Sequence, residues 1–165
     1  MRRSIVRYIL WALIVALILA VQMSKSLSIY GINPDLIMII CILFSLYKGE
    51  YKGEIFGFIL GITEDIFGDL FGLNAFALAF ICYFTSVYKR YIFVSDIVAY
   101  LIYIVISTIM KYIIYNVCLL IFRGNWILDG FLILNMIGEI VYNIVMGIAF
   151  YYIASFFFRK EEVPF

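Results

Sequence analysis

The chain has 165 residues, of which 67% are hydrophobic and only 14% are charged. Soluble domains are about 45–50% apolar and about 25% charged, so a soluble fold of this size could not bury so much apolar surface. The net charge of +1 gives no nucleic-acid-binding character, and the absence of histidine removes the commonest general base and metal ligand. We therefore expect a non-enzymatic, all-α integral membrane protein with no catalytic residue, cofactor or metal site.

Apolar runs recur along the whole chain and predict a single polytopic membrane domain over residues 1–165. We expect a bundle of six transmembrane helices, at about residues 4–21, 35–47, 55–67, 75–88, 94–122 and 131–158. The second and third runs are shorter than the roughly 20 residues that a bilayer requires, so whether they cross it fully stays open. Most basic residues near span ends fall on the side of the two termini, and only Lys25 and Arg123 fall on the other. The positive-inside rule thus places both termini in the cytoplasm.

The first span carries a stripe of small residues, Ala12, Ala16 and Ala20, at four-residue intervals. Such stripes let helix backbones approach each other closely in lipid. The stripe predicts packing within the chain or, alternatively, a docking face for another protein.

The second span opens on Asn33, Pro34 and Asp35. Asn33 is a candidate cap, proline suits the first helical turn, and a carboxylate is favourable near a helix N-terminus. After this span, the sequence Lys-Gly-Glu-Tyr-Lys-Gly-Glu at residues 48–54 is expected to form a polar loop.

Three glycines, Gly53, Gly57 and Gly61, recur every four residues and are followed by Glu64 and Asp65. Residues four apart share a helix face, so the glycines predict a smooth groove for packing against a neighbouring or partner helix. Glu64 and Asp65 are expected at the outer end, together with Asp35. Adjacent helical residues diverge by about 100°, so we interpret the acids as a polar outer lid or partner contact in preference to a cation site.

Two charged residues, Lys111 and Glu139, fall inside the fifth and sixth apolar runs. Their depths from the outer side are about 16 Å and about 12 Å at helical rise, and a short loop joins the two runs. Charges at membrane depth are costly and usually have a partner. The sequence predicts an intramembrane ion pair between them, acting as a structural clasp or, alternatively, within a substrate or proton path. The nearby amides are Asn116, Asn135 and Asn143.

The stretch from Pro34 to Arg90 resembles the MreD family of bacterial rod-shape-determining inner-membrane proteins. The features that carry the resemblance are the Pro34–Asp35 start, the glycine series, a Gly-Phe-x-x-Gly-x-x-x-Asp pattern at Gly57, Phe58, Gly61 and Asp65, and the pair Leu73–Asn74. In the last element, Asn74 stands where the family usually has glycine. The length, the six-span layout and the basic inner loops also fit this family.

The resemblance implies a multi-pass scaffold of the cell-elongation machinery, which serves rod shape, peptidoglycan synthesis and cell-wall organisation. It implies an MreC-like partner, bound through small-residue helix faces, and indirect links to MreB and to the RodA–transpeptidase synthase. The family is similar in fold to the S-components of ECF vitamin transporters, so a substrate-binding transporter subunit is the alternative function. An outward polar pocket of roughly 300 Å³ or more would favour that alternative. A packed or lipid-filled interior with an exposed small-residue groove would favour the scaffold.

Overall fold

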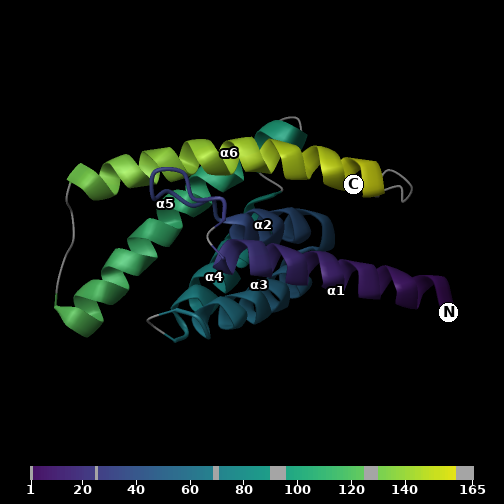
Figure 1. The fold of residues 1–165 in the computed structure, drawn as a ribbon. Coiled ribbons are helices and arrows are strands. Elements are labelled where there is room, and N and C mark those ends of the chain that lie inside the picture. Colours follow the sequence, from purple (N-terminus) through teal and green to yellow (C-terminus); the bar gives the residue numbers. More distant parts are fainter. Residues whose placement is uncertain (1, 25, 69–70, 90–95, 125–129, 159–165) are drawn as a thin grey trace.

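A computed structural model describes residues 2–24, 26–68, 71–89, 96–124 and 130–158, without the side chains of 2–12, 50, 96, 123, 131 and 156–158. These residues form six helices (Figure 1): α1 Arg2–Met23, α2 Leu36–Lys48, α3 Glu50–Asp65, α4 Leu73–Tyr88, α5 Asp96–Arg123 and α6 Gly130–Phe158. The predicted all-helical class is confirmed over the described part of the chain.

Two helices are long and apolar enough to cross a bilayer by themselves. They are α5, over Ile97–Phe122, and α6, over Leu132–Ser155. The segments Leu13–Met23, Leu36–Lys48 and Leu73–Tyr88 are apolar but shorter. This is consistent with a helical membrane protein, while bilayer crossing by all six helices stays a prediction.

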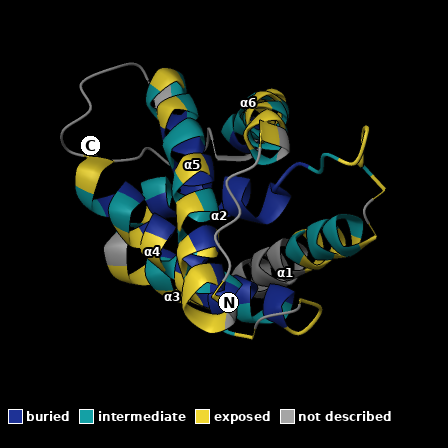
Figure 2. Cartoon of the chain, turned by 90° about the vertical axis from the view of Figure 1, so that its left-hand side faces the viewer, coloured by how far each residue is buried: buried dark blue, intermediate teal, exposed yellow. Residues whose placement is uncertain are grey.

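Helix α2 is the central element of the fold. Every residue from Leu36 to Leu43 is buried, which Figure 2 shows as a dark blue helix. All five other helices contact α2. A helix that is apolar all round belongs in a protein interior. The short length of α2 therefore goes with a position shielded by its neighbours.

The connection between α2 and α3 is tighter than expected. Gly49 alone separates the helices, so the predicted loop over residues 48–54 is wrong. Gly49 has φ 83°, a left-handed conformation that glycine adopts without strain, and its N–H donates to the Ser45 carbonyl at 3.0 Å. Of the charged residues that indicated a loop, Lys48 ends α2 and the others lie in the first turns of α3. In these turns Tyr51 and Lys52 are exposed and Gly53 faces α2.

The glycine series brings α3 against its neighbours. A Cβ atom at Gly57 would lie 2.6 Å from Cys82 Sγ and 2.8 Å from the Leu78 carbonyl oxygen, both on α4. At Gly61 it would overlap the backbone of Asn74 and Ala75, and at Gly53 it would overlap the Ser45 side chain of α2. All three glycines are buried. We call this contact of α3 with α4 and α2 the glycine seam.

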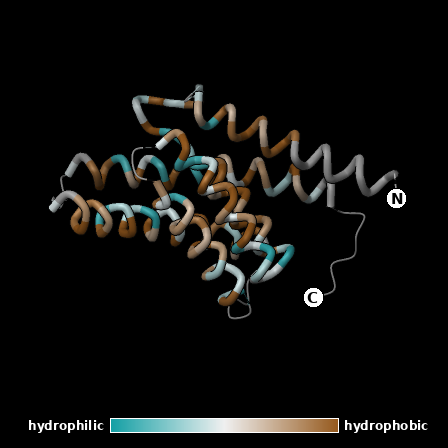
Figure 3. The backbone as a smooth tube through the Cα atoms, turned by 90° about the horizontal axis from the view of Figure 1, so that it is seen from below, coloured by the Kyte–Doolittle hydropathy of each residue, from teal (hydrophilic) through white to brown (hydrophobic). Residues whose placement is uncertain are grey.

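The outward faces of α1 and α6 are apolar. Leu13 and Leu17 on α1 are 61% and 65% exposed, and Leu134 on α6 is 66% exposed. Figure 3 shows that hydrophobic residues, in brown, recur along the described parts of the chain. The first turn of α1 and the last turn of α6 lie at the same end of the molecule (Figure 1). The exposed apolar faces of α1 and α6 suit contact with lipid or with another helix.

Candidate functional site

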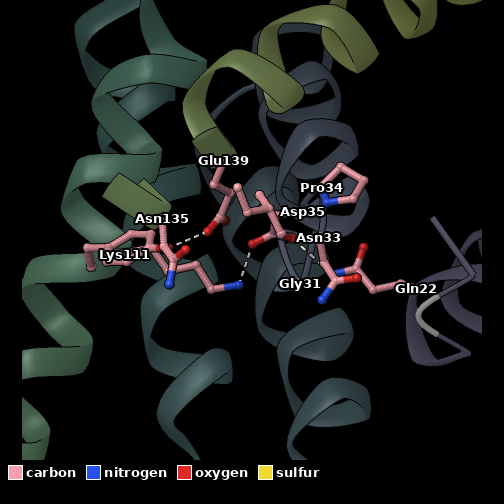
Figure 4. Close-up of a pocket in the computed structure, with 10 residues that line it drawn as sticks. Gln22, Gly31, Asn33, Pro34, Asp35, Lys111, Asn135 and Glu139 are labelled. Carbon is pink, nitrogen blue, oxygen red and sulfur yellow. Dashed lines mark hydrogen bonds and ion pairs between the residues drawn. The ribbon is translucent and has the colours of Figure 1, made fainter. Parts of the chain in front are cut away.

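Polar side chains gather around a cavity of about 280 Å³ (Figure 4). Its lining comes from the end of α1, the segment before α2, the middle of α5 and the first half of α6. We call this cavity the polar pocket; its lining residues are Gln22, Gly31, Ile32, Asn33, Pro34, Asp35, Lys111, Tyr112, Asn135 and Glu139.

The lysine of the pocket has different partners from those expected. Lys111 Nζ forms an ion pair with Asp35 Oδ2 and lies 3.8 Å from Glu64 Oε2. The predicted Lys111–Glu139 ion pair is wrong, because Glu139 Oε2 instead accepts a hydrogen bond from the Tyr112 hydroxyl at 2.7 Å. Successive helical residues point about 100° apart, so Lys111 faces α2 and α3 while Tyr112 faces α6. The depths of Lys111 and Glu139 along their helices do not determine the rotation of α5 about its axis, and this rotation decides which residues Lys111 faces.

Asp35 serves as the cap of α2, the role that the sequence had assigned to Asn33. Its Oδ1 accepts the Met38 backbone N–H at 3.0 Å. Its own N–H donates to Asn143 Oδ1 on α6 at 2.8 Å, and Asn143 Nδ2 donates to Thr108 Oγ1 on α5 at 3.1 Å. Asp35 is only 4% exposed. One residue thus connects α2 with α5 and α6.

Gln22, like Tyr112, is a residue of the site that the sequence did not reveal. Its Oε1 accepts the Leu36 N–H at 2.7 Å, and its Nε2 donates to Asp35 Oδ1 at 3.2 Å and to Glu64 Oε1 at 2.9 Å. An amide has both donors and an acceptor, so a single side chain joins α1 to α2 and α3. The available signal was a lone polar residue ending a long apolar run.

Asp65 lies next to Glu64 in the chain but takes part in different contacts. Its carboxylate accepts the backbone N–H groups of Gly72 at 2.9 Å, Asn74 at 2.9 Å and Ala75 at 3.0 Å. Carboxylates stabilise helix N-termini in this way, so Asp65 holds the start of α4. Glu64 points instead toward Gln22 and Lys111. The two acids diverge as helical geometry requires.

The two small-residue series have different surroundings. The glycine face is covered by α4 and α2, which leaves no room on it for a partner helix. On α1, Ala16 and Ala20 are exposed, and the side chain of Ala12 lies outside the described set. Of the small-residue faces proposed for partner binding, only the one on α1 is open.

The polar pocket brings acidic and basic side chains together. Within the described residues, no three His, Cys, Asp or Glu side chains are placed to coordinate a metal ion. The pocket and the network beneath it combine three carboxylates, Asp35, Glu64 and Glu139, with the ammonium group of Lys111. Such a set can recognise polar or charged groups in a partly enclosed space.

No curated protein and no solved structure matches the chain significantly. One protein family does, described as rod shape-determining protein MreD, and its model matches residues 1–161 of the 165-residue chain. The match includes the glycine seam, the polar pocket and all six helices. The chain therefore belongs to the MreD family of bacterial rod shape-determining membrane proteins.

Proposed function

We propose that this protein is a non-enzymatic scaffold of the cell-elongation machinery, in which rod shape is coupled to peptidoglycan synthesis. The observation that carries the proposal is the family match over nearly the whole chain. The proposed location is the bacterial inner membrane, with six spans and both termini in the cytoplasm. The two long apolar helices, α5 and α6, support a membrane location.

The proposed direct partner is an MreC-like protein, through which MreB and the RodA–transpeptidase synthase would be linked. The outer face of α1 supports a role in docking, because Ala16 and Ala20 are exposed beside Leu13 and Leu17. Small side chains let a second helix approach closely, and the neighbouring leucines supply apolar contact area. The partner's transmembrane helix would pack along this face.

The test of this docking face is a double substitution, Ala16→Leu with Ala20→Leu, followed by co-purification with the MreC-like protein in mild detergent. Both positions are exposed, so the fold should remain intact while the close approach is blocked. We expect partner recovery to fall by about tenfold or more, equivalent to about 1.4 kcal/mol of binding free energy.

A matched control uses Ala149→Leu, which enlarges an exposed alanine on α6. Partner recovery should be unchanged in this variant, and all variants should unfold at the wild-type temperature. Undiminished recovery with the α1 double variant, or the same loss with the α6 variant, would rule out the α1 face.

A second candidate function is a substrate-binding subunit of a transporter. The polar pocket favours it, because its volume of about 280 Å³ is close to the 300–1,000 Å³ typical of ligand sites. Affinity purification in mild detergent with identification of the recovered proteins separates the two functions. Recovery of an ATPase and a transport-core subunit in place of an MreC-like protein would establish the transporter role.

A further inference from the structure

We propose that the polar pocket binds a small organic cation through a primary ammonium or guanidinium group, with Glu139 as its main anchor. This inference goes beyond the scaffold function, because binding requires no partner protein. It rests on the charged side chains that line the pocket, on the unsatisfied hydrogen-bond acceptor of Asn33 and on the size of the pocket.

The first argument is the excess of negative charge. Asp35 and Glu139 are the two carboxylates that line the pocket, and Lys111 is the only basic side chain in its lining. Glu64 is not part of the lining and lies 3.8 Å from Lys111 Nζ. Lys111 is already engaged by Asp35 and Glu64. An opposite charge stabilises the ionised form of a partly buried carboxylate, so a cation that enters the pocket would pair with Glu139, the lining carboxylate that Lys111 does not engage.

Glu139 is the carboxylate with room for that group. It forms no ion pair with any described residue, and its Oε2 accepts the Tyr112 hydroxyl at 2.7 Å. Unlike Asp35 and Glu64, it is only partly buried. In Figure 4, Glu139 lies at the pocket with Asn135 and Lys111 beside it. A cation entering the pocket would therefore meet Glu139 before the deeper acids.

The second argument is independent of charge and concerns hydrogen bonds. The Oδ1 atom of Asn33 is buried and accepts no hydrogen bond within the described part of the chain. Asn33 belongs to the lining of the pocket. Buried acceptors without donors cost free energy. Ammonium and guanidinium groups carry three and five N–H donors and no acceptor, so either group can donate to Asn33 Oδ1 as well as to Glu139.

The geometry also narrows the class of ligand. Carboxylate and amide oxygens of the lining suit a ligand that carries several N–H donors, which favours an organic cation. An anion would face the carboxylates of Asp35 and Glu139. A volume of about 280 Å³ admits a small molecule or a lipid headgroup, but not a folded chain.

The test uses agmatine, which carries both a guanidinium and a primary ammonium group. It is titrated by calorimetry into the full-length protein in dodecyl maltoside and an amine-free phosphate buffer. We expect saturable binding of agmatine and no binding of 1,5-pentanediol, a neutral molecule of similar length. Glu139→Gln should weaken binding by about tenfold or more, because hydrogen bonds to charged groups contribute at least that factor.

Glu54→Gln is the matched control, because it removes a carboxylate of α3 that is not part of the pocket lining. Its affinity for agmatine should equal that of the wild type. If Glu139→Gln cannot be purified folded, Glu139→Asp replaces it and should weaken binding by withdrawing the carboxylate by one methylene.

Two sources of the amine are separated in nanodiscs of phosphatidylglycerol made with and without phosphatidylethanolamine. If agmatine binds only in nanodiscs without phosphatidylethanolamine, the lipid headgroup competes for the pocket and is the ligand. If agmatine binds equally in both kinds of nanodisc, the ligand is a free amine. The proposal is overturned if agmatine does not bind, if the diol binds equally well, or if loss of the Glu139 charge has no effect. None of these failures would affect partner recovery, so the scaffold proposal is tested separately.

Discussion

Adding a single methyl group at Gly61 tests whether the glycine seam holds the fold together. In Gly61→Ala, the new Cβ atom would overlap backbone atoms of Asn74 and Ala75 at the start of α4. Those two residues are also fixed by hydrogen bonds to Asp65, so this turn cannot yield locally. Overpacking costs about 1–3 kcal/mol, and a clash with backbone belongs at the upper end. Alanine gains about 1 kcal/mol over glycine in a helix, so we expect a net loss of about 2 kcal/mol.

Gly147→Ala is the matched control, because it adds the same methyl group at another buried helical glycine. There the new Cβ would approach most closely the Cδ1 atom of Ile104, the end of a flexible side chain. Moving that side chain costs about 1 kcal/mol, which offsets the gain in helix propensity. The free energy of unfolding should therefore change by about zero.

Both variants are measured by titrating dodecyl maltoside micelles with sodium dodecyl sulfate while circular dichroism follows helix loss. The reasoning is refuted if Gly61→Ala is as stable as the wild type. Equal destabilisation by Gly61→Ala and Gly147→Ala would also refute it, because the backbone contact would then not be the cause. Gly57→Leu, whose side chain would collide with α4, should be more damaging than either.

The polar contacts give three further predictions for the same assay. Asp65→Ala removes the acceptor of three backbone N–H groups and should cost about 2 kcal/mol, whereas a loss under about 0.5 kcal/mol would contradict its role as a cap. Lys111→Met leaves buried carboxylates unpaired and should cost about 3–5 kcal/mol; an unchanged stability would mean that these acids do not need the lysine. Adding Asp35→Asn to Lys111→Met should recover about 1 kcal/mol or more of the unfolding free energy, while the loss from adding Glu139→Gln should be nearly additive. Recovery with Glu139→Gln and additive loss with Asp35→Asn would instead indicate that Lys111 pairs with Glu139.

The helical class and the family could be recognised from the sequence because each rests on local patterns. Long apolar runs need no tertiary information to indicate helices in a membrane protein. The four-residue glycine spacing indicates a smooth helix face whatever packs on it. The sequence could not identify which helix packs on the glycine face of α3. The next helix in the chain, α4, and a helix of a partner protein would make equivalent contacts there.

The partner of Lys111, the start of α3 and the role of Gln22 could not be predicted from the sequence. They depend on helix rotation and on contacts between residues far apart in the chain. The partner of Lys111 follows from a rotation of α5 that the apolar pattern leaves undetermined, because apolar residues occur on every side of α5. The residues after Gly49 are charged, yet they belong to a helix because Gly53 packs on α2. The role of Gln22 depends on N–H groups supplied by another helix, which no local pattern around residue 22 reveals.

The position of the polar pocket follows from the burial of α2. A helix N-terminus presents N–H groups without intrahelical acceptors, and these must find partners when the helix is buried. Gln22 accepts the Leu36 N–H and Asp35 accepts the Met38 N–H, so the requirement is met partly by a carboxylate. A carboxylate at this depth needs a cation, which Lys111 provides. Placing a lysine inside the long apolar helix α5 keeps α5 and α6 from closing over α2 by purely apolar contact. The pocket thus lies where a central apolar helix begins, and its acidic character is a consequence of capping that helix.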